Sequence, residues 1–476
     1  MSVPTIPVPS PVATPTRDLV AWLSALSLDD VPGDVIERAK HLLLDGIACG
    51  LVGARMSWSD LATDAICGVE GVGPVALIGT GRRTTPMAAA LLNSSYIQGF
   101  ELDDYHPIAP LHNVSILLPA MLSTLPHAAA TDGATLLLAA VRGFEVGPRV
   151  GRALHGAQMI ERGWHSGPDF GGPAAAAAAG TLLGLDADGF EDAMGHAATQ
   201  ACGLMSAQFE SMGKRMQHGF AARNGLLGAI LAANGYVGIK QVFEREFGGF
   251  LSTFGEGHDP DPTQISSELG TRWETAINAV KPYAAMAGLH ASIDAARALL
   301  AEAPVDVDRI RAITVSVPDG SYKHGGWRAE RPLTAIGAQM NLAYAVAVTL
   351  LDGTALAAQF APGRLDDDDI WALIERTTPR HEPAFDQRVE DAYNARLEIT
   401  MDDGTHREAF VESPRGGAGR PLRNADIVDK YRSLTASLVE PDRARSIERT
   451  VLGLENLDDA TTLVDLLGPP VAPMFV

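Results

Sequence analysis

The sequence predicts a mainly α-helical protein, in which a large all-helical domain carries a smaller α+β domain. Three observations support this fold class. Apolar residues recur at helical spacing from residue 18 to about residue 276. Alternating apolar and polar residues, typical of strands, appear between residues 277 and 412, and helical spacing returns from residue 413. The chain of 476 residues also exceeds the size at which one hydrophobic core stops growing, so two domains are expected.

The first helical part begins with Val20, Trp22, Leu23 and Leu26, which share one face of a helix. Residues 37–50 then predict a long, mostly buried helix. Several later segments are rich in Ala, Leu and Gly and are apolar nearly all round, which is typical of helices buried in the middle of a bundle. These expected helices lie near residues 86–100, 114–129, 134–155, 173–184, 187–205 and 219–235.

The α+β part is predicted from two strands and a turn. Residues 309–317 and 396–401 alternate with period two, and Asp402-Asp-Gly404 offers a hairpin turn into a third strand at 406–411. Between and after them, further helices are expected, and the last three should return to the helical domain. They cover residues 339–351, 369–375, 426–438, 441–454 and 460–467. The predicted organisation is a disordered arm (1–16), a helical domain (17–276), an α+β domain (277–412) and C-terminal helices (413–476).

Composition excludes several classes of partner. A net charge of −21 argues against nucleic acid and against anionic membrane surfaces, and no uncharged apolar run is long enough to span a membrane. Cys49, Cys67 and Cys202 are widely spaced, which favours reduced thiols over a disulfide or zinc framework. Residues 1–16 lack the features of a signal peptide, so a cytoplasmic protein is expected. An anionic substrate would bind only where basic groups locally overturn the negative field.

The segment from Glu101 to His112 is the first candidate for chemistry. It gathers three carboxylates, a phenol and two imidazoles, and Pro107 and Pro110 exclude a regular helix there. Titratable groups on an irregular segment between apolar helices are suited to acid–base catalysis. A metal site is the weaker interpretation, because no known ligand spacing is present. Asp103 or Asp104 could equally cap a helix.

A second candidate begins at Trp164 and His165. Glycines followed by Pro173 and an alanine run predict a loop that enters a helix, with proline at its first position. The free N–H groups and positive dipole of such a helix start suit a carboxylate ligand. The alternative is that the small residues only allow close helix packing.

Two basic segments complete the set. Lys214-Arg215-Met-Gln-His218 lies directly before an apolar helix, so at least one of its cations is expected to point inward and to meet an anion. Lys281 to His290 lies at the junction of the two domains, where small-molecule clefts are common. The first segment could instead be solvated, and the second could be a hinge with incidental charge. No complete dinucleotide-binding fingerprint, P-loop or nucleophile elbow is present.

Taken together, these segments resemble the MmgE/PrpD family over nearly the whole chain, and within it the fungal cis-aconitate decarboxylases. The resemblance rests on residues 37–49, on Glu101 to His106 with Ala109-Pro-Leu-His112, and on three later runs. The later runs are Thr199 to Gln208, Gln217 to Gly228 and Gly326 to Pro332.

What the resemblance implies is a large helical domain with an α+β lid domain, a homodimer in the cytoplasm and no cofactor. Active-site roles in the family fall on His112, His165, Lys214 and Lys281, with the acidic cluster nearby. Two departures from many relatives are Tyr105, where they carry Thr in an Asp-x-Asp-Asp-Thr run, and Met286, where they often carry Cys or His.

The residues and the resemblance together predict a site for a small di- or tricarboxylate. The expected reaction is decarboxylation of cis-aconitate to itaconate; 2-methylcitrate or citrate dehydration, or dicarboxylate epimerisation, is the alternative on the same scaffold. A non-catalytic carboxylate-binding protein is a further alternative, although it would not need paired acid–base groups. The candidate catalytic residues are His112, His165, Lys214, Tyr105, Glu101 and Asp103, and the candidate substrate-binding residues are Lys281, His290, Arg215 and Gln208.

Overall fold

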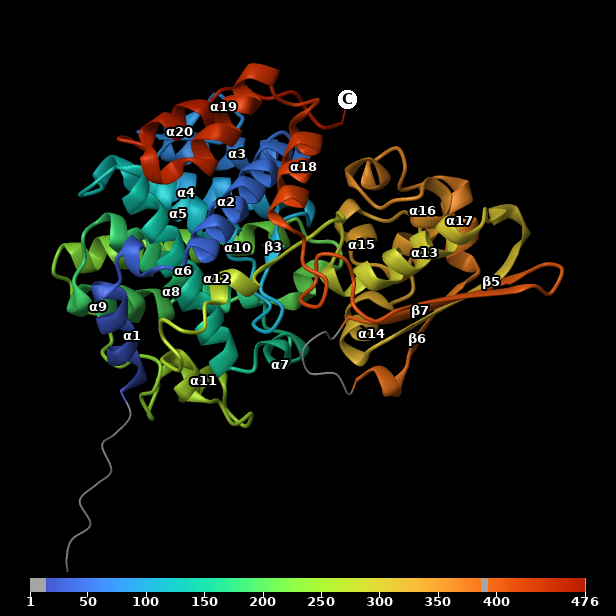
Figure 1. The fold of residues 1–476 in the computed structure, drawn as a ribbon, viewed down its shortest axis with the longest axis horizontal. Coiled ribbons are helices and arrows are strands. Elements are labelled where there is room, and N and C mark those ends of the chain that lie inside the picture. The colour runs from blue at the N-terminus through green and yellow to red at the C-terminus, as the bar shows by residue number, and fades with distance from the viewer. Residues whose placement is uncertain (1–13, 387–392, 476) are drawn as a thin grey trace, which may run out of the picture.

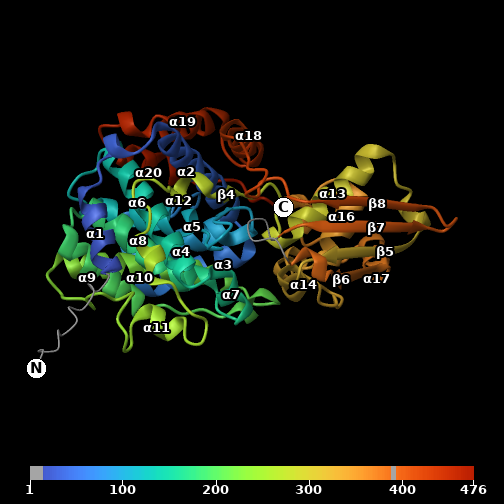
Figure 2. The same ribbon diagram turned by 60° about the horizontal axis from the view of Figure 1, so that its bottom comes forward.

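The structure is a computed structural model that describes residues 14–386 and 393–475. A large helical lobe lies beside a smaller lobe of helices and one sheet (Figure 1, Figure 2). The predicted fold class, mainly α with a smaller α+β part, is confirmed. Most of the arm expected at residues 1–16 lies outside the described residues, and the first helix begins at Pro15.

The helical lobe is built from the first twelve helices and two short strand pairs. β1 (Val75–Ala76) pairs with β2 (Arg83–Thr84), and β3 (Asp104–Tyr105) pairs with β4 (Ala279–Val280), in both cases antiparallel. The helices are α1 (Pro15–Ala25), α2 (Gly33–Gly53), α3 (Ser57–Glu70), α4 (Pro86–Ile97), α5 (Val114–Thr124), α6 (Gly133–Ala153), α7 (Gly156–Glu161), α8 (Ser166–Leu182), α9 (Ala187–Ala198), α10 (Gly213–Ala233), α11 (Phe250–Phe254) and α12 (Glu274–Ile277).

Helices α8 and α10 form the centre of this lobe. Every residue of α8 is buried, and the helix packs on α5, α6, α9 and α10. Small side chains permit this close packing: a Cβ added at Gly225 of α10 would lie 2.4 Å from the Cβ of Ala175 in α8. The expectation of helices buried on all sides is therefore confirmed for α8.

Two sequence expectations about helix starts are wrong. Helix α8 begins at Ser166, so Pro173 lies inside it rather than at its first position. Helix α10 begins at Gly213, so Lys214 belongs to its first turn and not to a preceding turn segment. For α8, tertiary packing overrides the local signal of Pro173, because small residues before the proline let the helix pack closely against its neighbours.

The small lobe contains a four-stranded sheet in the order β6-β5-β7-β8. Strands β5 (Ile310–Val317), β7 (Ala395–Met401) and β8 (His406–Val411) run antiparallel and agree with the predicted strands, and the predicted hairpin turn places Gly404 at φ +85°. Strand β6 (Thr377–His381) pairs in parallel with β5 at the sheet edge, the position that its Pro379 permits. The lobe also contains α13 (His290–Glu302), α14 (Asp319–Gly325), α15 (Ala335–Gln339), α16 (Leu342–Asp352) and α17 (Asp368–Glu375).

The C-terminal helices return to the helical lobe. Helices α18 (Asn424–Thr435) and α19 (Pro441–Leu452) pack on α2, and α20 (Thr461–Leu467) contacts β1 (Figure 1). Lys430 of α18 forms an ion pair with buried Asp45 of α2, with 2.6 Å between Nζ and Oδ1. Its ammonium also donates to the carbonyl oxygen of Leu102 at 2.5 Å, which links these helices to the acidic segment.

The hydrophobic core is continuous between the lobes. One cluster of buried side chains includes Leu42 of α2, Tyr283 and Leu289 at the junction, and Val315 and Ile399 of the sheet. A second cluster lies within the helical lobe around α1, α8, α9 and α10. Within the described residues, no helix is both long and apolar enough to cross a membrane.

Candidate active site

A cavity of about 620 Å³ lies between the lobes. Seven of the ten predicted site residues line it, although they come from separate parts of the chain. These seven are Glu101, Tyr105, His112, His165, Gln208, Lys214 and Lys281. The small lobe contributes the opposite wall through Pro318, Asp319, Gly320, Ser321, His324, His381, Phe385 and Asp386.

Glu101 is the electrostatic centre of the site. Its carboxylate accepts hydrogen bonds from Lys214 Nζ, from Lys281 Nζ at 2.8 Å and from Gln98 Nε2 at 2.6 Å. The residue adopts a left-handed backbone conformation, with φ 54°, which costs on the order of 1–3 kcal/mol for a non-glycine residue. This conformation ends the short helical turn before Glu101 and begins the irregular segment.

The two lysines and Glu101 stabilise one another's charges. Burial alone would raise the pKa of the Glu101 carboxyl, but Lys214, Lys281 and His112 outweigh it and hold this pKa well below its ordinary value. Burial lowers the pKa of Lys214, and Glu101 partly opposes that shift. The expectation that an inward Lys214 would meet an anion is met by a protein carboxylate, because Lys214 and Lys281 share the single negative charge of Glu101.

His112 is oriented by an acidic partner. Its Nδ1 lies 3.1 Å from Oδ2 of Asp103, and Asp103 is fully buried. The carboxylate accepts the Nδ1 hydrogen and leaves Nε2 as the other functional nitrogen of the ring. This is the arrangement in which a carboxylate fixes the tautomer of a catalytic imidazole. Asp103 therefore contacts the cavity residue His112 without lining the cavity itself.

His165 is held differently. Gln217 donates its amide hydrogen to the carbonyl oxygen of Leu204 at 3.1 Å, so its Oε1 must accept a hydrogen from Nδ1 of His165. The Nε2 of His165 therefore carries a lone pair when the ring is neutral. Burial, with smaller contributions from Lys214 and His112, lowers the pKa of His165 to about 3. At neutral pH His165 is an uncharged hydrogen-bond acceptor.

The remaining acidic residue of the segment, Asp104, serves the fold. Asp104 accepts the backbone N–H of Val114 at 2.9 Å, at the start of α5, and a hydrogen bond from Asn278. Burial raises the pKa of Asp104 well above its ordinary value. The helix-capping alternative is therefore confirmed for Asp104, whereas Asp103 pairs with His112.

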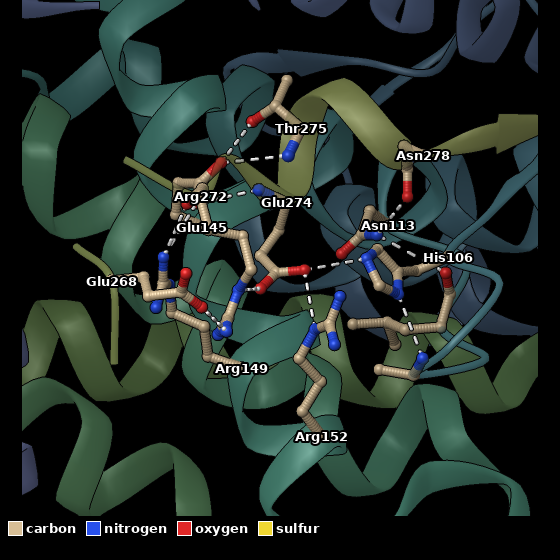
Figure 3. A network of polar contacts seen from close by, with 12 residues as sticks. His106, Asn113, Glu145, Arg149, Arg152, Glu268, Arg272, Glu274, Thr275 and Asn278 are labelled. Atoms are coloured by element: carbon tan, nitrogen blue, oxygen red, sulfur yellow. Dashed lines mark hydrogen bonds and ion pairs between the residues drawn. The ribbon is translucent and has the colours of Figure 1, made fainter. Parts of the chain in front are cut away.

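His106 belongs to a buried polar network behind the cavity (Figure 3). Its Nε2 lies 3.0 Å from Glu274, which also accepts from Arg152 at 2.9 Å and from Arg272 at 2.8 Å. Burial would raise the pKa of Glu274, but His106 and nearby arginines, Arg152 first among them, lower this pKa to about 2. The network holds α12 against the acidic segment, and none of these four residues lines the cavity.

Two predicted substrate-binding residues lie away from the cavity. Arg215 does not line the cavity: its guanidinium donates to the carbonyl oxygen of Gly99 at 2.7 Å and lies 4.0 Å from the ring centre of Trp58. His290 is buried against Tyr283 and bonds the carbonyl oxygen of Ala285 at 3.0 Å. Adjacent residues on a helix face different directions, so Lys214 lines the cavity and Arg215 does not.

The structure adds residues that the sequence did not single out as site residues. On the small lobe, His324 and His381 line the cavity, and His381 Nε2 lies 2.7 Å from Asp386. In the helical lobe, His218 lies behind His112 and His165 with ring centres 4.9 and 5.0 Å away. His218 lies four residues after Lys214, so the two side chains share one face of α10. This spacing could have indicated from the sequence that His218 lies near the site.

Across residues 14–386 and 393–475, no group of three or more His, Cys, Asp or Glu side chains is arranged to hold a metal ion.

Comparison with known proteins identifies the family. The model of the MmgE/PrpD N-terminal domain matches residues 17–263, and that of the C-terminal domain matches residues 283–456. The chain belongs to the MmgE/PrpD family. The family resemblance expected from the acidic and basic segments is thus confirmed over most of the sequence.

Three relatives show how far the similarity extends within the MmgE/PrpD family. The chain is 46% identical to "Cis-aconitate decarboxylase-like protein oryM" of Aspergillus oryzae, over 96% of this chain and 98% of that protein. It is 43% identical to "Cis-aconitate decarboxylase" of Aspergillus terreus, over 97% of each chain. It is 26% identical to the human protein of the same name, over 96% of this chain and 95% of the human one.

Proposed function

We propose that this protein decarboxylates cis-aconitate to itaconate and CO2 in the cavity between its lobes. The observation that carries the proposal is the 43% identity, over 97% of both chains, to a protein named cis-aconitate decarboxylase. The cavity supports it, because two imidazoles, His112 and His165, and two lysines, Lys214 and Lys281, line it. These are the groups that a reaction with carboxylate binding and proton transfer needs.

Lys214 and Lys281 are proposed to hold substrate carboxylates while remaining bound to Glu101. An ammonium carries three N–H donors, and the contact with Glu101 uses one of them in each lysine. The other donors are available to a ligand in the cavity. Glu101 thus gives the two buried ammonium groups a shared counter-charge, and an unpaired charge would be costly there.

The proposed reaction begins with cleavage of the bond to the carboxylate on the methylene arm. Loss of CO2 leaves an electron pair on that carbon, and the pair shifts through the neighbouring double bond. The former double-bond carbon beside the terminal carboxylate then takes a proton. Itaconate results, with a new terminal double bond, and electrons and protons balance without a redox or metal cofactor.

His112 is proposed as the proton donor. Asp103 stabilises positive charge on its ring through Nδ1. His165 is less suited to this role, because its lowered pKa of about 3 leaves it uncharged at neutral pH. We propose that His165 instead accepts a hydrogen bond that orients the substrate, and that Tyr105 and Gln208 complete the wall around it.

Assembly, location and domain limits are proposed along with the reaction. We propose a cytoplasmic homodimer whose domains span residues 17–276, with the C-terminal helices from 413, and residues 277–412. Support for self-association comes from Leu204, Phe209 and Met212, which are exposed apolar side chains near one another in sequence. Light scattering on the purified protein measures the assembly directly: a mass near that of one chain contradicts it.

A product assay tests the proposed reaction. The purified protein is incubated separately with cis-aconitate, citrate and 2-methylcitrate, and CO2 release and the proton NMR spectrum are followed. Itaconate formed together with CO2 from cis-aconitate is the expected result. A hydrated or dehydrated product without CO2 would instead support a dehydratase, and unchanged cis-aconitate would contradict decarboxylation.

A further inference from the structure

His218 is a buried imidazole that the proposed reaction does not use. It lies on α10, is fully buried, and does not line the cavity. Its ring stacks on that of His165, with 5.0 Å between centres and 23° between planes. The ring of His112 lies 4.9 Å away on the cavity side, tilted by 44°. Two imidazoles that line the cavity therefore share one imidazole behind them.

The hydrogen bonds of Ser115 determine the tautomer of His218. The Ser115 hydroxyl donates its only hydrogen to the backbone carbonyl oxygen of His112 at 3.0 Å. Its oxygen, 2.9 Å from Nδ1 of His218, must therefore accept a hydrogen from that nitrogen. The Nδ1 hydrogen of His218 is thus fixed, and a continuous chain of hydrogen bonds runs from His218 through Ser115 to the backbone of His112.

The second ring nitrogen of His218, Nε2, indicates that the ring is uncharged. Its Nε2 is buried and has no hydrogen-bond partner among the described residues. A hydrogen on Nε2 would create a charged ring with an unsatisfied donor, which is costly inside a protein. The ring packs directly against Gly167, where only a glycine leaves room for it. A Cβ added at Gly167 would lie 2.1 Å from Cδ2 of His218.

We propose that His218 is a positioning residue: an uncharged imidazole locked between His112 and His165 that fixes the donor His112 and keeps the two cavity imidazoles in different roles. Its packing fixes the distance between them. Its bond to Ser115 holds the backbone from which the His112 side chain extends. The link to turnover rests on the proposed function, whereas the tautomer and charge of His218 do not.

The charged groups around His218 favour the same state. Burial, followed by the nearby His112, His165 and Lys214, holds the pKa of His218 well below its ordinary value, and Glu101 opposes this only weakly. Because His218 is neutral, it places no second positive charge next to a protonated His112 that would repel its own. His112 can then carry the proton that the reaction consumes.

The inference is tested first on the protein without ligand. Histidine 15N NMR is recorded from about pH 5.5 to pH 8, a range around the ordinary histidine pKa, for wild type and for Ser115→Ala, His218→Asn and His218→Phe. Asn keeps a donor toward Ser115 but removes the ring, whereas Phe keeps a ring but removes the donor. His218 is expected to remain neutral with hydrogen on Nδ1, and each variant is expected to shift the His112 titration midpoint. A His218 that titrates in this range, or an unchanged His112 midpoint in all three variants, overturns the proposal.

Kinetics separate positioning from a structural role. The variants are expected to lower kcat about tenfold or more, with KM within about threefold, and to shift the acidic limb of the kcat profile against pH. Ser115→Ala removes only one hydroxyl group, so it provides the kinetic test if the His218 variants do not fold. Variants that lose only thermal stability, with kcat per folded protein and pH profile unchanged, contradict positioning. If wild type forms no itaconate, the proposed function fails, and the NMR titration still decides the state of His218.

Discussion

At the scale of single residues, the site depends on how each titratable group is partnered. His112 and His165 both line the cavity, yet Asp103 carries a negative charge beside the first and Gln217 a neutral amide beside the second. The same side chain is thereby suited to give a proton in one position and to accept a hydrogen bond in the other. Two environments for two chemically identical groups are a common device in acid–base sites.

Replacement of the proposed donor is expected to abolish turnover. His112→Gln keeps a polar side chain but cannot deliver a proton, so kcat should fall by about 10²-fold or more. Asp103→Asn should lower kcat less, because the donor remains. The measurement is the initial rate of CO2 release, with circular dichroism as a check of folding. His258→Gln is the matched control, because His258 is exposed and does not line the cavity; wild-type activity in His112→Gln would refute the assignment.

Acid is expected to destabilise the fold in two stages. The pKa of His165 is about 3 in the folded protein and 6.5 ordinarily, so the unfolded chain binds the proton first and stability falls as pH drops from about 6.5 toward 3. The pKa of Glu274 is about 2 against 4.5, so its contribution is present above pH 4.5 and is lost below that pH. The unfolding temperature, measured against pH, should therefore decrease on acidification from neutral pH. An increase would contradict these shifts.

At the scale of elements, close contact between α8 and α10 positions the site. Helix α8 follows directly after His165, and α10 carries Lys214, Gln217 and His218 on its first two turns. The contact between these helices therefore fixes the distance between cavity groups that are far apart in sequence. Small residues at the crossing make this approach possible.

A methyl group at the crossing tests this dependence. Gly225→Ala places a Cβ 2.4 Å from Ala175 and 2.5 Å from the carbonyl oxygen of Gly172 in α8, so it should destabilise the protein by about 1–3 kcal/mol and reduce activity. Calorimetry measures the change in unfolding temperature. Gly68→Ala is the control, because that helical glycine is exposed with no neighbour within 4 Å and Ala should stabilise it by up to about 1 kcal/mol. Equal effects of the two substitutions would contradict the packing argument.

Sequence patterns predicted the elements better than they predicted the partners. Period-two alternation located β5 and β7, but β6 was not predicted, because Thr377-Thr-Pro-Arg-His contains proline and lies at an edge. Composition predicted that an inward Lys214 needs an anion. It could not identify Glu101, because this contact joins residues 113 positions apart and depends on the packing of helices. For the same reason, nothing local distinguished His290 from Lys281 as a cavity residue.

At the scale of the whole molecule, the C-terminal helices pack against the N-terminal helix α2. Residues after 412 leave the small lobe and cover α2, where Lys430 meets Asp45 and Leu102 (Figure 2). The acidic segment is therefore held by residues from both ends of the sequence. The net charge of −21 does not prevent a site for anions, because two buried lysines, Lys214 and Lys281, line the cavity and share only one carboxylate, Glu101.

Loss of the Lys430 contact is expected to weaken the whole molecule. Lys430→Met leaves buried Asp45 without its ion-pair partner, which should cost about 3–5 kcal/mol and lower the unfolding temperature. Arg432→Met on the same helix is the control: its pair with Glu448 is exposed and should contribute about 0–1 kcal/mol. An equally small effect of both substitutions would show that the buried pair does not join the C-terminal helices to the core.

The most direct measurement of the central claim is turnover of cis-aconitate in D2O. A proton donor fixed on one side of the cavity predicts itaconate with one deuteron in its saturated methylene group, on a single face, and none in the vinyl group. NMR of the product, with a chiral reagent to resolve the two faces, gives both answers. Deuterium on both faces, deuterium in the vinyl group, or no itaconate would contradict a positioned acid at His112.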